Sequence, residues 1–375
     1  MYLILSFIYY LLMFFNALLA LKGKRNKIIA VITVIFLGLL FCCNLGSEGD
    51  HEAYKYEFLN SDLQLSNDSF FDTFCTFIRG LGVASYPLFL LCVWVMIITL
   101  SRIGTKGFVN NYHTVFALCM PYIAPHLGVA LRFVIALSVF LFSLRFLLNK
   151  KIGIYILCSI IAGLFHASFF IALLFIPFSV CFNKNNDRIN RIFIGAIFVV
   201  ALILSYFTIS SSSLPYLTQI LAIVDGSSIE SRSILYLNDE VNKGGFLVIP
   251  IYCIGILTVF YWYKAKRKFK LVLNNNKGEN VEKFTIYVNC ILALFIPLAL
   301  ISEIFIRLFF IQTIINAIYL NSFANLNISL PQKRMVKLFL LMYMCAWAFL
   351  SYIKLFDISI SNWLKTATYF LQASL

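Results

Sequence analysis

Residues 131–151 read LRFVIALSVFLFSLRFLLNKK, an apolar run as long as a membrane span that ends in a basic turn. A helix crosses the hydrocarbon core of a bilayer with about 20 mostly apolar residues. Two charged side chains, Arg132 and Arg145, lie near the ends of the apolar part, and Lys150 and Lys151 close it. This stretch is typical of a transmembrane helix.

The composition of the whole chain points the same way. Of its 375 residues, 61% are hydrophobic and 12% are charged, and the mean hydropathy is +0.90. Soluble domains average about 45–50% apolar and about 25% charged residues. No long polar block is present that would fold as a separate soluble domain. We therefore predict a single transmembrane domain over residues 1–375 and exclude a soluble enzyme.

Apolar runs of span length recur along the chain and predict an all-α integral membrane protein. We expect a polytopic bundle of about twelve transmembrane helices, within a range of roughly 10–13. The first run lacks a basic start and a small-residue cleavage site, so we expect a retained span and not a signal peptide. The expected spans are 2–21, 28–43, 83–100, 109–124, 129–147, 152–166, 167–182, 192–211, 245–263, 284–301, 305–325 and 336–353.

The distribution of charge predicts the orientation of these spans. The net charge is +14, and the clusters of basic residues follow the odd-numbered spans, the largest of them in the segment 264–283. Because Lys and Arg concentrate in cytoplasmic loops, we expect 264–283 to be a basic cytoplasmic loop and both termini to lie outside. Topology explains the charge, so no nucleic-acid partner is expected.

Two longer segments fall on the predicted outer face. The first, 44–82, contains the acidic stretch SEGDHEAYKYEF, and the second is 212–244. Both carry apolar residues at helix-like intervals, which predicts short interfacial helices in two long extracytoplasmic loops. The acids of the first loop lack regular ligand spacing, so we interpret them as a solvated surface and not as a metal site.

Sequence motifs for several common chemistries are absent. The chain has no Walker A sequence, no H-E-x-x-H, no G-x-S-x-G and no spaced Cys/His cluster among its ten cysteines. Nucleotide hydrolysis and zinc chemistry therefore lack support, and we expect neither a metal nor a cofactor.

A few ionisable residues lie where lipid would be expected. Arg132, His166, Glu303 and Arg307 all map to the outer half of the predicted membrane. Glu303 and Arg307 are four residues apart, so they either neutralise one another in a structural ion pair or leave the arginine available for an anionic ligand. His166 either hydrogen-bonds a neighbouring helix or takes part in chemistry. A polar cavity floored by two arginines would suit a phosphate-bearing lipid.

Four stretches carry a resemblance to a known family. They are the acidic first outer loop SEGDHEAYKYEF, the helix entry YPLFLL at 86–91, the run 131–151, and IIAGLFHASFFIALLFIP at 160–177. In these stretches the chain resembles the EpsG-like branch of the Wzy-type polysaccharide polymerases, bacterial membrane proteins that assemble O-antigen, capsule or exopolysaccharide.

Individual residues match the pattern of this family. Arg132 stands at the outer start of a helix, His166 and Ser168 form the His-x-Ser that ends an Ala-rich helix, and Arg307 in EIFIRLFF matches a recurring arginine. One position departs from the pattern, because Tyr86 stands where the family often has a Glu before Pro-Leu-Phe. An acidic role at that position is therefore not carried over.

The resemblance implies a glycosyltransferase at the outer face of the bacterial cytoplasmic membrane. It would transfer the growing glycan from undecaprenyl diphosphate to a new lipid-linked repeat unit, without a metal. The implied partners are the lipid-linked oligosaccharide, membrane lipid, a chain-length regulator and a flippase.

The implied reaction assigns roles to the unusual ionisable residues. The leaving diphosphate needs positive charge in a low-dielectric site. The expected diphosphate-binding residues are Arg132, Arg307 and Arg232. The acceptor hydroxyl needs a base near the outer surface. The expected bases are His166 and Glu303, followed by Asp50.

Two other functions fit parts of the sequence. A lipid-linked oligosaccharide flippase or other transporter would also admit a diphosphate, but it should expose its site to both sides and break helices at the midplane. A membrane acyltransferase would bring a catalytic histidine deep in the membrane with a cytoplasmic donor route. The clustering of ionisable residues toward one face favours the polymerase.

Overall fold

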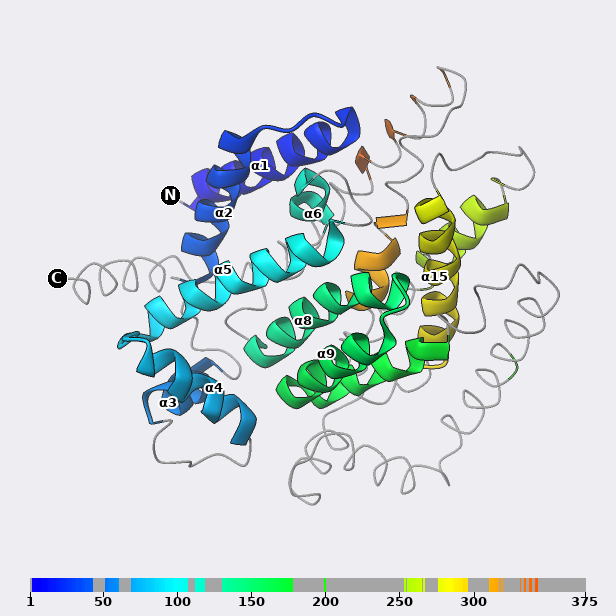
Figure 1. The fold of residues 1–375 in the computed structure, drawn as a ribbon. Coiled ribbons are helices and arrows are strands. Elements are labelled where there is room, and N and C mark those ends of the chain that lie inside the picture. The colour runs from blue at the N-terminus through cyan, green and yellow to red at the C-terminus, as the bar shows by residue number, and fades with distance from the viewer. Residues whose placement is uncertain are drawn as a thin grey trace, which may run out of the picture. The chain divides into compact units, whose positions relative to one another are not determined.

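A computed structural model describes residues 2–42, 51–60, 69–106, 112–118, 130–177, 255–264, 276–295, 310–316 and 318–319. It also describes residues 199, 253 and 266 and six residues between 331 and 342. Every regular element in these ranges is helical, which confirms the predicted all-α fold for this part of the chain (Figure 1).

The helices follow the apolar runs and the amphipathic segments of the sequence. The α-helices are α1 (Tyr2–Lys22), α2 (Lys27–Cys42), α3 (His51–Leu59), α4 (Ser69–Gly80), α5 (Tyr86–Thr105), α6 (Tyr112–Leu118), α8 (Leu131–Leu148), α9 (Ile152–Phe165) and α15 (Asn276–Ala293). A 3₁₀ helix, η3 (Ala167–Phe175), follows α9. The short helices α3 and α4 lie in segment 44–82, as the sequence predicts.

Two of these helices, α5 and α8, are long and apolar enough to cross a membrane by length and composition. Shorter apolar helices lie in α1, α2 and α9. These features are compatible with a membrane protein. The number of about twelve spans depends partly on segments outside the described residues and stays a prediction.

One helix begins earlier than expected. The sequence predicts a span from residue 284, whereas α15 begins at Asn276 and so includes the last eight residues of segment 264–283. The charged residues Glu279, Glu282 and Lys283 favour a loop in the sequence. Glu282 can nevertheless lie in a buried part of α15, because its carboxylate pairs with Lys266.

Among the described residues, several large apolar side chains lie on the surface and some polar side chains are buried. Large apolar side chains such as Phe7, Ile28 and Leu257 are 66–71% exposed. Polar side chains such as Asn16 and Asn289 are fully buried between helices. Apolar surface outside and polar groups inside suit helices that face lipid.

The chain divides into two compact units by its internal contacts. Unit 1 comprises residues 1–145, 164–166 and 329–375, and unit 2 comprises residues 146–163 and 167–328. In unit 1, α6 packs on α1 and α2, and α3 packs on α4 and α5. In unit 2, α15 packs on η3.

A buried polar cluster holds α6 against the α1–α2 turn in unit 1. The backbone N–H of Asn26 donates to His113 Nε2 at 3.0 Å, so the proton of this imidazole lies on Nδ1. His113 Nδ1 lies 2.6 Å from Asn16 Oδ1, and Asn16 Nδ2 donates to Thr33 Oγ1 at 2.8 Å. The hydrogen bonds join three helices and satisfy groups that lipid would leave unpaired.

Helices α5 and α8 approach closely at Gly104. A Cβ at this position would overlap the backbone carbonyl of Leu141 in α8, so α5 or α8 would have to shift. We expect Gly104→Ala to destabilise the protein by about 1–3 kcal/mol, measured as a lower thermal midpoint in detergent. Gly153 of α9 is the matched control, because a Cβ there meets open space. Gly153→Ala should be neutral or slightly stabilising, and an equal loss in both variants would contradict the close crossing.

Candidate functional site

The candidate site is built around Arg132, the second residue of α8. Its Nη2 donates to both carboxylate oxygens of Glu57 in α3, at 2.6 Å and 2.8 Å. The two side chains are only 18% and 16% exposed. Because screening by water is weak at such exposure, this ion pair is a strong local interaction.

The sequence of α3 explains why Glu57 faces α8. Tyr54, Glu57 and Phe58 stand at i, i+3 and i+4, which places them on one face of a helix. Tyr54 and Phe58 are buried, whereas Glu52 pairs with Lys55 at 3.5 Å on the exposed side. The carboxylate of Glu57 is therefore carried inward by its two aromatic neighbours.

The guanidinium group of Arg132 lies over two adjoining aromatic rings. Its Cζ lies 5.4 Å from the centre of the Tyr54 ring and 4.9 Å from that of the Phe71 ring in α4. A cation over an aromatic face gains about 0.5–2 kcal/mol, more when water is excluded. The short helices α3 and α4 thus contribute both rings and the carboxylate that contact Arg132.

An aromatic cluster attaches α3 and α4 to the start of α5. Phe58 stacks on Phe89 with ring centres 4.4 Å apart, and Tyr86 lies 5.9 Å from Phe89. Phe74 of α4 lies 5.3 Å from Phe165 at the end of α9. Tyr86, which replaces the glutamate of the family pattern, is thus a buried packing residue of this cluster.

His166 lies beside the same turn of α8 as Arg132. Its ring is 5.4 Å from the ring of Phe133, edge to face, and Phe133 directly follows Arg132 in the chain. The structure therefore places His166 against the residue that follows Arg132, although the two positions are 33 apart in the sequence. Ser168 of the predicted His-x-Ser motif is buried in η3.

The thiol of Cys75 reports on the environment under α4. Burial raises the pKa of the Cys75 thiol, and the nearby carboxylates of Glu57 and Asp72 raise it further. The direction of this shift follows from the burial of the thiol and from the two negative charges beside it.

The other predicted site residues lie outside the described residues. They are Asp50, Arg232, Glu303 and Arg307. Their roles and the Glu303–Arg307 ion pair remain predictions. Among the described residues, no three His, Cys, Asp or Glu side chains come together as a metal site.

The family of the chain follows from its sequence match. A model of the EpsG family matches residues 27–365, which is most of the chain. The chain belongs to the EpsG family. The resemblance predicted from the sequence is confirmed, and membership associates the chain with polysaccharide biosynthesis by membrane proteins. No curated protein and no solved structure matches the chain.

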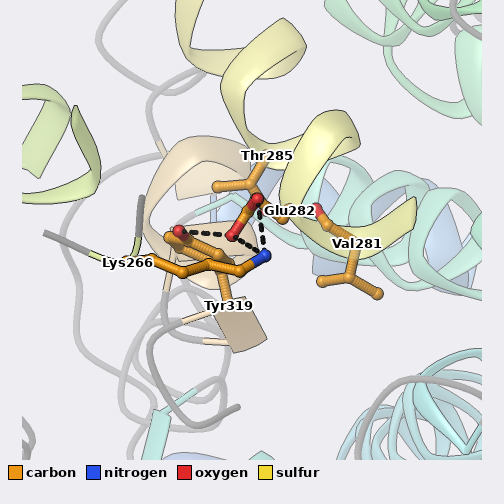
Figure 2. A network of polar contacts seen from close by, with 5 residues as sticks. All are labelled: Lys266, Val281, Glu282, Thr285 and Tyr319. Carbon is orange, nitrogen blue, oxygen red and sulfur yellow. Dashed lines mark hydrogen bonds and ion pairs between the residues drawn. The ribbon is translucent and has the colours of Figure 1, made fainter. Parts of the chain in front are cut away.

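Unit 2 of this EpsG-family chain holds a second group of buried charges, which sequence reasoning missed. Lys266 Nζ donates to both carboxylate oxygens of Glu282 at 2.9 Å and 3.0 Å, and the Tyr319 hydroxyl donates to the same carboxylate at 3.1 Å (Figure 2). The side chains of Lys266 and Glu282 are 12% and 8% exposed. Three segments that are apart in sequence thus meet at one carboxylate.

A cluster of amides continues this polar seam along α15. Asn289 donates to Asn316 Oδ1 at 2.6 Å and accepts a hydrogen bond from Gln312 at 2.9 Å. Glu282 and Asn289 are seven residues apart on α15, so they lie on one face of that helix. Gln312 and Tyr319, in the helical segment after residue 309, have the same spacing. Gly255 packs on this seam, since a Cβ added at Gly255 would lie 3.4 Å from Asn316 Nδ2.

The spacing of polar residues in the sequence could have indicated both the group around Glu282 and the amide cluster around Asn289. Polar residues at i, i+3 and i+7 in otherwise apolar helices mark a face that must pack against other polar groups. In the seam of unit 2, polar side chains from separate segments hydrogen-bond to one another, which indicates helix pairing. The site around Arg132 differs because a half-buried cation and an aromatic pair lie at the end of a helix.

Proposed function

We propose that the chain is a polysaccharide polymerase that joins undecaprenyl-diphosphate-linked oligosaccharide repeat units at the outer face of the cytoplasmic membrane. The observation that carries the proposal is Arg132, a guanidinium that lies over the adjoining rings of Tyr54 and Phe71 with a carboxylate at its Nη2. A group that holds one anion in a poorly hydrated site is chemically suited to hold a phosphate. Membership of the EpsG family supports the same function.

In the proposed reaction, an acceptor sugar hydroxyl attacks the anomeric carbon of the growing glycan. A bond forms between the acceptor oxygen and that carbon, the bond from the carbon to the diphosphate oxygen breaks, and undecaprenyl diphosphate leaves. Negative charge grows on the leaving oxygen, and Arg132 would stabilise it. Arg307 and Arg232 would contribute further positive charge.

The proton of the acceptor hydroxyl needs a base. His166 is our first candidate because its ring packs on Phe133, the residue after Arg132, and imidazole accepts protons near neutral pH. Glu303 and Asp50 are alternatives for this role. His166→Ala should then lower the rate of polymer formation by about 10²–10⁴-fold, and a normal rate would remove His166 from the mechanism.

The function can be tested by deleting the gene in its native host and sizing the surface polysaccharide. Loss of a polymerase leaves single repeat units at the surface or on the carrier. Loss of a flippase removes the surface material altogether, and loss of an acyltransferase leaves long chains that lack acyl groups. An unchanged chain length would contradict the polymerase.

A further inference from the structure

We propose that Glu57 is an internal competitor for the diphosphate site. In this proposal, which rests on the proposed function, the carboxylate of Glu57 occupies Arg132 in the substrate-free protein, and the diphosphate of the lipid carrier displaces it. Glu57 would then determine how tightly the protein holds the carrier before and after glycan transfer.

The charge balance of the site is the first argument. Arg132 and Glu57 form a pair with no net charge, and both carboxylate oxygens lie on the same guanidinium nitrogen. A neutral pair gives little stabilisation to a diphosphate that arrives with negative charge. A phosphate oxygen that reached Nη2 would also stand beside the carboxylate, where two like charges in a poorly hydrated site repel strongly. For Arg132 to give Nη2 and its full charge to a diphosphate, the carboxylate has to leave Nη2.

The structure allows this exchange without unfolding α3. Tyr54 and Phe58 attach α3 to its neighbours through buried rings, so the helix position does not depend on Glu57 alone. The Glu57 side chain is 16% exposed and has three rotatable bonds, so a change of rotamer can carry it toward water. Arg132 would stay over the rings of Tyr54 and Phe71 during the exchange.

The exchange predicts that removal of the competing charge strengthens anion binding. The apparent dissociation constant of a ligand rises as the competent fraction of its site falls. If Glu57 occupies Arg132 in about nine molecules of ten, Glu57→Gln should tighten diphosphate binding about tenfold. Glutamine keeps the length of the side chain and a carbonyl acceptor for Arg132, which favours retention of the fold.

The test is a titration of the purified full-length protein in detergent with inorganic diphosphate and, separately, with farnesyl diphosphate. Glu52→Gln is the matched control, because Glu52 lies on the exposed face of the same helix and loses the same charge. We expect tighter binding of both ligands to Glu57→Gln, no change for Glu52→Gln, and loss of the gain in Glu57→Gln/Arg132→Gln. If Glu57→Gln does not remain folded in size-exclusion chromatography, Glu57→Asp, whose shorter side chain weakens the pair, should tighten binding to a smaller extent.

Three results would overturn the proposal. They are unchanged or weaker binding in a folded Glu57 variant, tighter binding that persists without Arg132, and tighter binding of inorganic diphosphate but not of farnesyl diphosphate. The last result would assign the site to a soluble diphosphate and not to a lipid carrier. Failure of the proposed polymerase function is detected separately, because it appears as unchanged polysaccharide length in the deletion strain.

Discussion

Arg132→Lys is expected to reduce polymer formation by about 100-fold or more, although it keeps the positive charge. The ammonium group of lysine is a point charge that cannot present a planar edge to a phosphate, and it fits less well over the rings of Tyr54 and Phe71. The measurement is the length distribution of surface polysaccharide in a deletion strain that expresses each variant at equal level. Arg145→Lys is the matched control, since Arg145 lies at the other end of α8 and also contacts an aromatic ring, that of Phe142.

A charge swap separates catalysis from structural support at this position. Glu57→Arg/Arg132→Glu restores an ion pair between α3 and α8 but moves the guanidinium onto α3. We expect this double variant to fold better than Arg132→Glu alone, as seen by expression and thermal midpoint, and to remain unable to make polymer. Recovery of long chains by the swap would mean that Arg132 and Glu57 serve only to hold α3 against α8.

Lys266→Met is expected to cause a large loss of stability. The substitution leaves the carboxylate of Glu282 buried without its cation, and breaking a buried ion pair costs about 3–5 kcal/mol. The measurement is the free energy of unfolding or the thermal midpoint of the purified protein. Lys264→Met is the matched control, because Lys264 is exposed in the same helical segment.

Removal of the whole polar group should recover most of that stability. In Lys266→Met/Glu282→Leu/Tyr319→Phe, no buried charge remains and the hydroxyl that donated to Glu282 is also gone. Apolar replacements of similar volume are often neutral or stabilising in place of a buried pair. A triple variant as unstable as Lys266→Met would show that the loss comes from altered packing and not from an unpaired carboxylate.

Much of the helical structure could be predicted because its signals are local. The apolar runs at 2–21, 28–43 and 129–147 correspond closely to α1, α2 and α8. The break at His166 is also expected, since the predicted spans 152–166 and 167–182 divide there and α9 ends at Phe165. The predicted span begins at residue 284, whereas α15 begins eight residues earlier, because a charge that is paired within the bundle does not end a helix.

The candidate site could be predicted only in part, because pairing between distant residues leaves no local signal in the sequence. Arg132 and His166 stand out in the sequence because polar groups inside apolar runs are rare. Glu57 does not stand out, because it is one of several acids in a loop that resembles a solvated surface. Its selection as the partner of Arg132 depends on the register of α3 and on the attachment of α3 and α4 to α5 through Phe58, Phe74 and Phe89.

The amino-acid sequence is sufficient to predict that the chain is helical and rich in apolar spans, and to identify the few residues that break that pattern. Both follow from hydrophobicity and from periodicity within single segments. The packing of the helices selects which groups meet: Arg132 with Glu57 across 75 positions, and Glu282 with both Lys266 and Tyr319. Contacts of this kind depend on how helices pack and rotate against one another, and the energy of an ion pair depends on burial that no single segment specifies.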